Sequence, residues 1–293
     1  MNANAAILVG TASFTDPTLL ACGRFYPPGL PAAQRLPYYA ARFALVEIDS
    51  PYYALPEARV THQWALRTPP GFTINVKAYR AFTGHPVPAA ALPADLRREA
   101  QAQGTTYLHR LPGEVQRELW HRFTVALEPL RQSGKLGAVL FQFPPWLHAD
   151  DAGRRHVRQC ARMMQGHLLA LEYRHRSWFT PARRQSTLAL ARELDAVHVV
   201  VDSPQGFDNT VPAVWEATHP ELAMVRLHGR NAATWNAAGK ASSSRFNYEY
   251  SPAELAELAA RTRELAARVR RTHVVMNTNY EDQGMVNAQG FIQ

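Results

Sequence analysis

Short apolar segments recur along the whole chain, and each is followed by polar or turn-forming residues. They are rich in Val, Ile, Leu and Phe and almost uninterrupted in their apolar character, which is typical of parallel β-strands covered on both faces. Eight such segments are present: residues 5–11, 44–50, 72–79, 136–144, 168–174, 196–203, 222–230 and 272–280. We therefore expect eight buried strands.

Amphipathic helical patterns lie between most of these segments. The clearest covers residues 251–271, where Ser251 is a natural N-cap, Pro252 suits the first helical position and Glu254 completes a capping box. Apolar residues then recur three and four positions apart, so they form one face of the helix. Three more segments have a similar pattern: residues 113–133, 151–166 and 181–195.

Alternation of strands and helices, repeated eight times, predicts a (β/α)8 TIM barrel that occupies residues 1–293 as a single domain. The alternative is an open, doubly wound α/β sheet. The dinucleotide-binding form of that sheet has a GxGxxG turn after its first strand, whereas residues 9–16, VGTASFTD, contain one glycine. The barrel is therefore the favoured fold class.

The longest irregular connection covers residues 81–112 and follows the third predicted strand. It contains several prolines and glycines up to residue 93 and then has the pattern of a helix at about 94–103. Connections of this length are usually functional loops or disordered segments. We expect either a lid or a disordered loop.

Polar side chains collect where the predicted strands end. Residues two apart on a strand share a face, and the C-terminal ends of barrel strands surround the mouth where TIM-barrel enzymes hold their active sites. Four of these residues are candidate catalytic groups: Glu172, Asp202, Lys77 and His228. Nine more are candidate substrate-binding groups: Glu47, Asp49, Tyr53, Gln142, Arg174, Trp178, Arg226, Arg230 and Asn277.

Several of these charges have a structural alternative. Glu47 with a neighbouring arginine, or Asp202 with Arg226, would form ion pairs that close the top of the barrel. Burying many charges is costly unless they are paired or retained for a function. The set as a whole therefore favours a functional site.

Lys77 stands out because the chain has only three lysines among its 32 basic residues. A lysine on a buried strand can have a lowered pKa and form a Schiff base, or it can bind phosphate as a point charge. The simpler alternative is an ion pair with Glu47 or Asp49.

A divalent metal ion is a further alternative. The candidate ligands are Glu47, Asp49, Glu172, Asp202 and His228. The chain has no closely spaced ligand motif such as HExxH, and the basic residues among the candidates would repel a cation. We therefore expect no metal or other cofactor.

The formal net charge is +8 and the pI is about 9.8. This balance makes nucleic acid or another polyanion an admissible partner. No block of five like charges is present, so the basic residues are more typical of solvated helix faces than of a nucleic-acid-binding arm.

Two cysteines, Cys22 and Cys160, lie far apart and outside any CxxC pair, so no disulfide framework or zinc knuckle is indicated. The N-terminus lacks a signal-peptide pattern, and no apolar stretch approaches the roughly 18 residues of a membrane span. We expect a cytoplasmic protein without a membrane partner. No pattern in the chain indicates its oligomeric state.

Six motifs occur in an order that resembles the YecE-like family, known as domain of unknown function 72. They are VEIDSPYY (46–53), NVKAYR (75–80), LGAVLFQFPP (136–145), LEYRHRSW (171–178), VVVDSP (199–204) and VRLHGR (225–230). Asp49 stands where the family usually has asparagine, and Phe14 where it has tryptophan. The resemblance implies a TIM barrel and no established activity.

The strand-end residues favour an enzyme acting on a phosphorylated or otherwise anionic small substrate. Arg174, Arg226 and Arg230 would bind the anion, because guanidinium groups pair with phosphate in a bidentate geometry. Glu172 would act as general base or acid, with Asp202 and Lys77 setting its charge environment.

Two alternatives remain open. The basic surface and the aromatic residues near the strand ends favour a nucleic-acid-binding protein, including a hydrolase of the nuclease type. The third hypothesis is a Schiff-base lyase in which Lys77 is the nucleophile.

Overall fold

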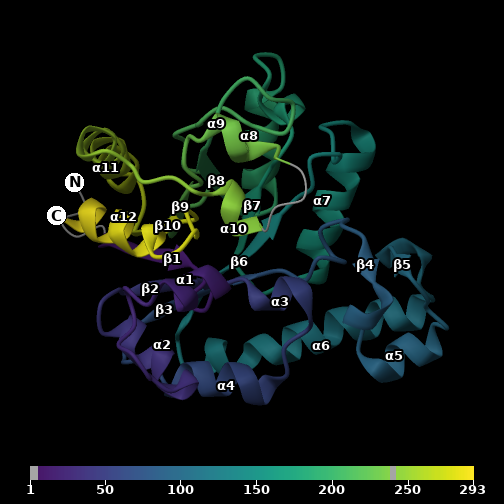
Figure 1. Ribbon diagram of the computed structural model, residues 1–293. Coiled ribbons are helices and arrows are strands. Elements are labelled where there is room, and N and C mark those ends of the chain that lie inside the picture. The colour runs from purple at the N-terminus through teal and green to yellow at the C-terminus, as the bar shows by residue number, and fades with distance from the viewer. Residues whose placement is uncertain (1–5, 238–241) are drawn as a thin grey trace.

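The structure, a computed structural model, describes residues 6–237 and 242–293 and has a closed barrel of eight parallel strands at its centre (Figure 1). The strands are β1 (Ala6–Ala12), β2 (Leu45–Ile48), β3 (Thr73–Lys77), β6 (Leu136–Gln142), β7 (Leu169–Glu172), β8 (Val197–Asp202), β9 (Leu222–Leu227) and β10 (Arg271–Met276). They follow one another around the barrel in chain order, and β10 pairs with β1 to close it. The predicted TIM barrel is confirmed.

Helices surround the strands, and apolar side chains of the longer helices pack onto the barrel (Figure 1). They are α1 (Pro17–Cys22), α2 (Ala32–Ala40), α3 (Ser50–Tyr53), α4 (Ala58–Leu66), α6 (Gly113–Gln132), α7 (Asp151–Met163), α8 (Arg184–Glu193), α9 (Ala232–Trp235), α10 (Ser242–Arg245), α11 (Pro252–Ala266) and α12 (Gln283–Ile292). Among the described residues, no helix has both the length and the apolar character needed to cross a membrane.

Helix α11 begins with the predicted capping box. The Ser251 hydroxyl accepts a hydrogen bond from the Glu254 amide, and the Glu254 carboxylate accepts one from the Ser251 amide. The helix ends at Ala266, five residues before the predicted end at Arg271. The amides of Arg270 and Arg271 donate instead to the carbonyls of residues 220 and 221, which starts β10 beside β9.

The expectation of a helix after every strand is wrong between β8 and β9. Residues 203–221 form no helix. This segment contains Pro204, Pro212 and Pro220, and a proline removes a backbone donor and obstructs the preceding helical turn. The segment is nevertheless packed, because Val214 is buried and its carbonyl lies 3.0 Å from His198 Nε2.

The insertion at residues 81–112 is folded and packed beside α6 (Figure 1). Its elements are β4 (Val87–Pro88), η1 (Ala89–Ala91), α5 (Ala94–Glu99), β5 (Thr105–Thr106) and η2 (Leu108–Arg110), with β4 antiparallel to β5. Phe82 stacks on Trp120 at 3.6 Å between ring centroids, and the Tyr79 hydroxyl donates to the Ala91 carbonyl. These contacts explain why the segment is not a disordered loop.

Candidate functional site

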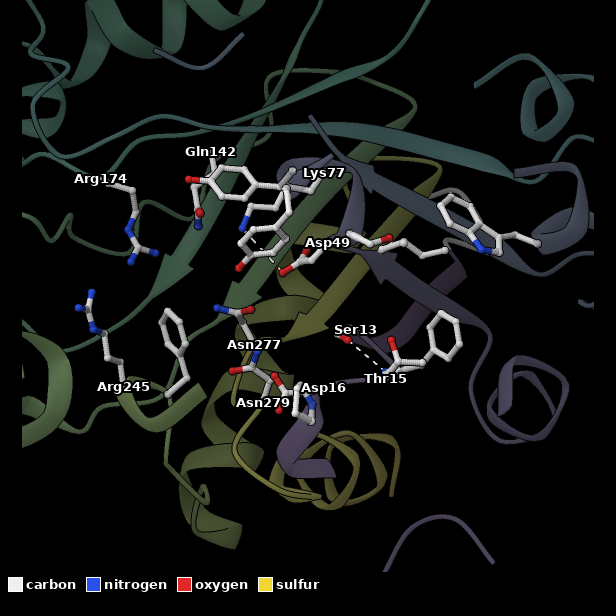
Figure 2. A pocket seen from close by; sticks show the side chains of 18 of the residues that line it. Ser13, Thr15, Asp16, Asp49, Lys77, Gln142, Arg174, Arg245, Asn277 and Asn279 are labelled. Atoms are coloured by element: carbon white, nitrogen blue, oxygen red, sulfur yellow. Dashed lines mark hydrogen bonds and ion pairs between the residues drawn. The ribbon is translucent and has the colours of Figure 1, made fainter. Parts of the chain in front are cut away.

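A cavity of about 800 Å³ lies at the C-terminal mouth of the barrel (Figure 2). The loops that follow the strands form its wall, and no residue of the insertion 81–112 lines it. Six of the predicted site residues line it: Asp49, Tyr53, Lys77, Gln142, Arg174 and Asn277. The structure therefore brings together predicted residues from five strand ends, since Asp49 and Tyr53 both follow β2.

Beneath the cavity, Arg226 is fully buried between two buried glutamates. Its Nη2 and Nε atoms donate to Glu47 at 2.6 and 3.2 Å, and its Nη1 atom donates to Glu172. All three side chains have no solvent exposure. This arrangement is an ion triad that closes the top of the barrel, so Arg226 does not reach the cavity.

Glu172 receives more donors than any other predicted site residue. Its Oε2 atom accepts from Arg226, while its Oε1 atom lies 2.8 Å from Gln142 Nε2, 3.0 Å from Arg174 Nη1 and 3.1 Å from His228 Nε2. Gln142 is well placed because it is in register with Glu172 on the neighbouring strand. The carboxylate is therefore held by four donors, and with no solvent exposure it is closed to a substrate.

Electrostatics also keep Glu172 ionised. Burial alone would raise its pKa, but the charge of Arg226 and the hydrogen bond from His228 outweigh this effect and hold the pKa well below its usual value. For Arg226, burial acts to lower the pKa, but the charges of Glu172 and Glu47 outweigh burial and raise the pKa above its usual value. Burial raises the pKa of Glu47 against the opposing effect of Arg226. Glu172 thus holds the two arginines in place and is a poor general base.

His228 is positioned as a neutral side chain. Asn277 Oδ1 accepts from Arg226, which orients the Asn277 amide group toward His228 Nδ1 at 2.7 Å. His228 Nδ1 is then the acceptor, so Nε2 bears the proton and donates to Glu172. Burial lowers the pKa of His228 to about 3, although Glu172 opposes the shift.

Acid should destabilise the protein partly through His228. In the unfolded chain its pKa is about 6.5, whereas in the folded chain it is about 3, so between these values the unfolded state binds the extra proton. The free energy of unfolding should therefore fall with decreasing pH in this window, by up to about 1.4 kcal/mol per pH unit for this group. Urea denaturation from about pH 7 to about pH 4 should show a shallower slope for His228→Gln. Identical slopes would contradict the prediction.

Asp202 and Arg230 form a separate network outside the cavity. Arg230 Nη2 donates to Asp202 at 2.9 Å and Arg230 Nη1 donates to Glu254 at 3.2 Å. The Tyr250 hydroxyl donates to Asp202 at 2.7 Å, and the Tyr248 hydroxyl donates to Glu254. Both carboxylates and the guanidinium are satisfied within the protein, so this network ties the loop after β9 to the start of α11.

Trp178 lies in the core and away from the cavity. It is fully buried on η3 (Arg176–Phe179), stacks on Tyr173 at 4.1 Å between ring centroids and donates from Nε1 to the Leu147 carbonyl. Its position next to the predicted strand end placed it among the candidates. The short helical turn after β7 directs the ring outward into the layer between barrel and helices.

Lys77 and Asp49 face the cavity as a loose ion pair. The Nζ atom lies 3.7 Å from Asp49 Oδ2, and it also lies 4.7 Å from the centroid of the Tyr52 ring. The Lys77 side chain is 11% exposed and the Asp49 side chain is 18% exposed. They are therefore the titratable pair that a ligand in the cavity can reach.

Arg174 and Arg245 point toward one another at one end of the cavity (Figure 2). Arg174 contacts Glu172 and also lies over the Trp235 ring at 4.9 Å. Within residues 6–237 and 242–293, no carboxylate lies within ion-pair distance of Arg245. Burial lowers the pKa of Arg174, and the positive charge of Arg245 contributes to this shift. Of the two guanidinium groups at this end of the cavity, that of Arg174 pairs with Glu172, and that of Arg245 has no carboxylate partner among the described residues.

Comparison with known proteins shows to which family the chain belongs. Residues 8–293 match the model of the family described as "Protein of unknown function DUF72". The chain belongs to the DUF72 family. The resemblance of the six motifs to this family is thereby confirmed.

Relatives of this DUF72 chain have the same extent and fold. It is 33% identical to the UPF0759 protein YunF of Bacillus subtilis (strain 168) over 257 residues, which are 87% of this chain and 84% of that protein. The solved structure of TM1631 from Thermotoga maritima MSB8 is 29% identical and has a TM-score of 0.77, with 98% of each chain covered. The solved structure of EF0366 from Enterococcus faecalis V583 is 24% identical and has a TM-score of 0.79, with 97% of this chain and 94% of that chain covered.

Part of the cavity wall in this DUF72 protein could not be predicted from the alternation of side chains along the strands. Arg245 ends the short helix α10, and Phe246, Asn209 and Asp16 lie in loops, so alternation along a strand does not predict the direction of these side chains. Only Asp16 had a local signal, because an aspartate before a proline is a typical helix N-cap, which it forms for α1.

Three of the candidate metal ligands already have other partners. Glu47 and Glu172 bind Arg226, and Asp202 binds Arg230. Within the part of the chain that the structure describes, no three His, Cys, Asp or Glu side chains are grouped so that they would hold a metal ion.

Proposed function

We propose that this protein is an enzyme that binds a phosphorylated or otherwise anionic small molecule in the mouth cavity. The observation that supports the proposal is the Arg174–Arg245 pair, because Arg245 has no carboxylate partner among the described residues. Two like charges at one end of a cavity repel each other, and an anion bound between them would relieve this repulsion. A phosphate group accepts from both guanidinium groups at once.

Lys77 and Asp49 are the groups to which we assign proton transfer. Glu172 is occupied by four donors, and Asp202 lies outside the cavity. A protonated lysine next to an ionised aspartate provides a donor and an acceptor at one place, which suits an isomerase, a lyase or a hydrolase that moves a proton. Schiff-base formation at Lys77 and binding of nucleic acid stay predictions.

Replacing Arg245 by alanine tests the anion site. We expect the dissociation constant for inorganic phosphate, measured by isothermal titration calorimetry, to rise about tenfold or more, because a hydrogen bond to a charged group contributes about 1.5–3 kcal/mol. The free energy of unfolding should change by less than about 0.5 kcal/mol, since Arg245 is exposed.

Arg98→Ala is the matched control, because Arg98 is an exposed arginine on α5, outside the cavity. It removes the same charge and should leave phosphate affinity unchanged. Equal phosphate affinity in the wild type and in Arg245→Ala would overturn the proposed function.

A further inference from the structure

Charge is distributed unevenly along the mouth cavity. The two arginines Arg174 and Arg245 lie at one end, whereas Asp16 and Asn279 lie together elsewhere on the wall and Asp49 lies beside Lys77 (Figure 2). Ser13 and Thr15 line the wall near Asp16. The site therefore has one cationic end and one region rich in carboxylate, amide and hydroxyl groups.

The carboxylates of Asp16 and Asp49 disfavour a phosphate group in the polar region. Ionised aspartates only accept hydrogen bonds, and a phosphate at neutral pH presents mainly acceptors, so the two repel each other. A ligand that occupies the whole cavity needs an anion at the arginine end and hydrogen-bond donors at the other. An ammonium group is disfavoured as that donor, because Lys77 already places a positive charge beside Asp49. Neutral hydroxyl groups meet both requirements.

Two acceptor atoms on the cavity wall lack a donor within the described residues. They are the Oδ1 atoms of Asp49 and Asn279, both shielded from solvent. A polar atom in this situation is unfavourable by about 1–3 kcal/mol. These two atoms are therefore candidate acceptors for a ligand hydroxyl group. By contrast, Oδ1 of Asp16 accepts hydrogen bonds from the amide and the hydroxyl of Thr18.

Aromatic rings complete the same wall. Phe14, Tyr52 and Trp64 line the cavity together with the polar groups. Flat aromatic faces beside hydroxyl-binding groups suit a ligand with an apolar ring face and polar edges. The cavity of about 800 Å³ is also far larger than a single phosphate needs, since cavities of about 300–1,000 Å³ enclose molecules of drug size.

We propose that the ligand is a phosphorylated sugar whose phosphate lies between Arg174 and Arg245 and whose hydroxyl groups face Asp16, Asp49 and Asn279. This inference rests on the proposed function, because it uses the same anion site. It adds that the hydroxyl groups, and not only the phosphate, determine which molecule binds.

The test compares two ligands that share a phosphate and six carbons. A hexose 6-phosphate has the hydroxyl groups, and n-hexyl phosphate lacks them. By isothermal titration calorimetry we expect the wild type to bind the hexose phosphate at least tenfold more tightly. Asn279→Leu, which keeps the side-chain size and removes its hydrogen bonds, should weaken hexose phosphate binding about three- to tenfold and leave hexyl phosphate binding unchanged.

The outcomes separate the two proposals. Equal or tighter binding of hexyl phosphate, with both ligands weakened by Arg245→Ala, would overturn the sugar inference and leave the anion site standing. An effect of Asn279→Leu on both ligands alike would also overturn it. Absence of binding by either phosphate and by inorganic phosphate would overturn the proposed function, and the sugar inference with it. Far-ultraviolet circular dichroism of each variant confirms that it is folded before titration.

Discussion

Replacing Arg226 by methionine should lower the free energy of unfolding by about 3–5 kcal/mol. The side chain has no solvent exposure and makes hydrogen bonds to both Glu47 and Glu172. Methionine fills a similar volume, so the loss comes from two buried carboxylates that no longer have their main counter-charge. Urea denaturation at neutral pH measures the difference.

Two comparisons isolate the cause of this destabilisation. Adding Glu47→Gln and Glu172→Gln to Arg226→Met removes the unpaired charges and should restore part of the lost stability. Arg59→Met, which breaks an exposed ion pair with Glu57, should cost less than about 1 kcal/mol. A loss of less than about 1 kcal/mol for Arg226→Met would show that the triad does not hold the barrel together.

Trp178→Ala should also cost about 3–5 kcal/mol of stability. The ring is fully buried, stacks on Tyr173 and donates a hydrogen bond of 2.7 Å to the Leu147 carbonyl. Truncation therefore leaves a cavity between the barrel and its helices and an unsatisfied carbonyl. Thermal or urea denaturation measures the loss.

The same variant distinguishes a core residue from a ligand-binding one. At a temperature where Trp178→Ala is folded, its affinity for inorganic phosphate should equal that of the wild type, since the ring does not line the cavity. Trp146→Ala is the control, because Trp146 is 54% exposed and its removal should change stability much less. A stable Trp178→Ala variant that has lost phosphate binding would contradict this assignment.

The sequence alone predicted the barrel correctly because the relevant signals are local. Eight apolar segments separated by helical patterns leave few ways to bury every strand on both faces. The capping box at Ser251 and Glu254 involves residues three apart and formed as predicted. The missing helix between β8 and β9 had a local signal too, in the three prolines of residues 203–221.

Strand parity also identified several of the polar residues that line the cavity, but not their separate roles. Arg174 and Arg226 have the same side-chain chemistry and similar positions at strand ends. One lines the cavity and the other is completely buried. Likewise Glu172 has the composition of a general base, and only its four donors show that it is not free to act as one.

These roles depend on contacts between residues that are distant in the chain. Arg226 is 54 positions from Glu172, and the pairing of β7, β8 and β9 brings the two together. Arg226 is 179 positions from Glu47 on β2, and these two groups meet only when β10 pairs with β1 and closes the barrel. The sequence therefore determined which side chains lie at the mouth, because side chains alternate between the two faces of a strand whichever strands it pairs with. Closure of the barrel decided which charges neutralise each other in its interior, and the loops decided that Arg245 faces Arg174 across the remaining space. Pairing of buried charges is a matter of distance and desolvation, and both are set by the tertiary structure.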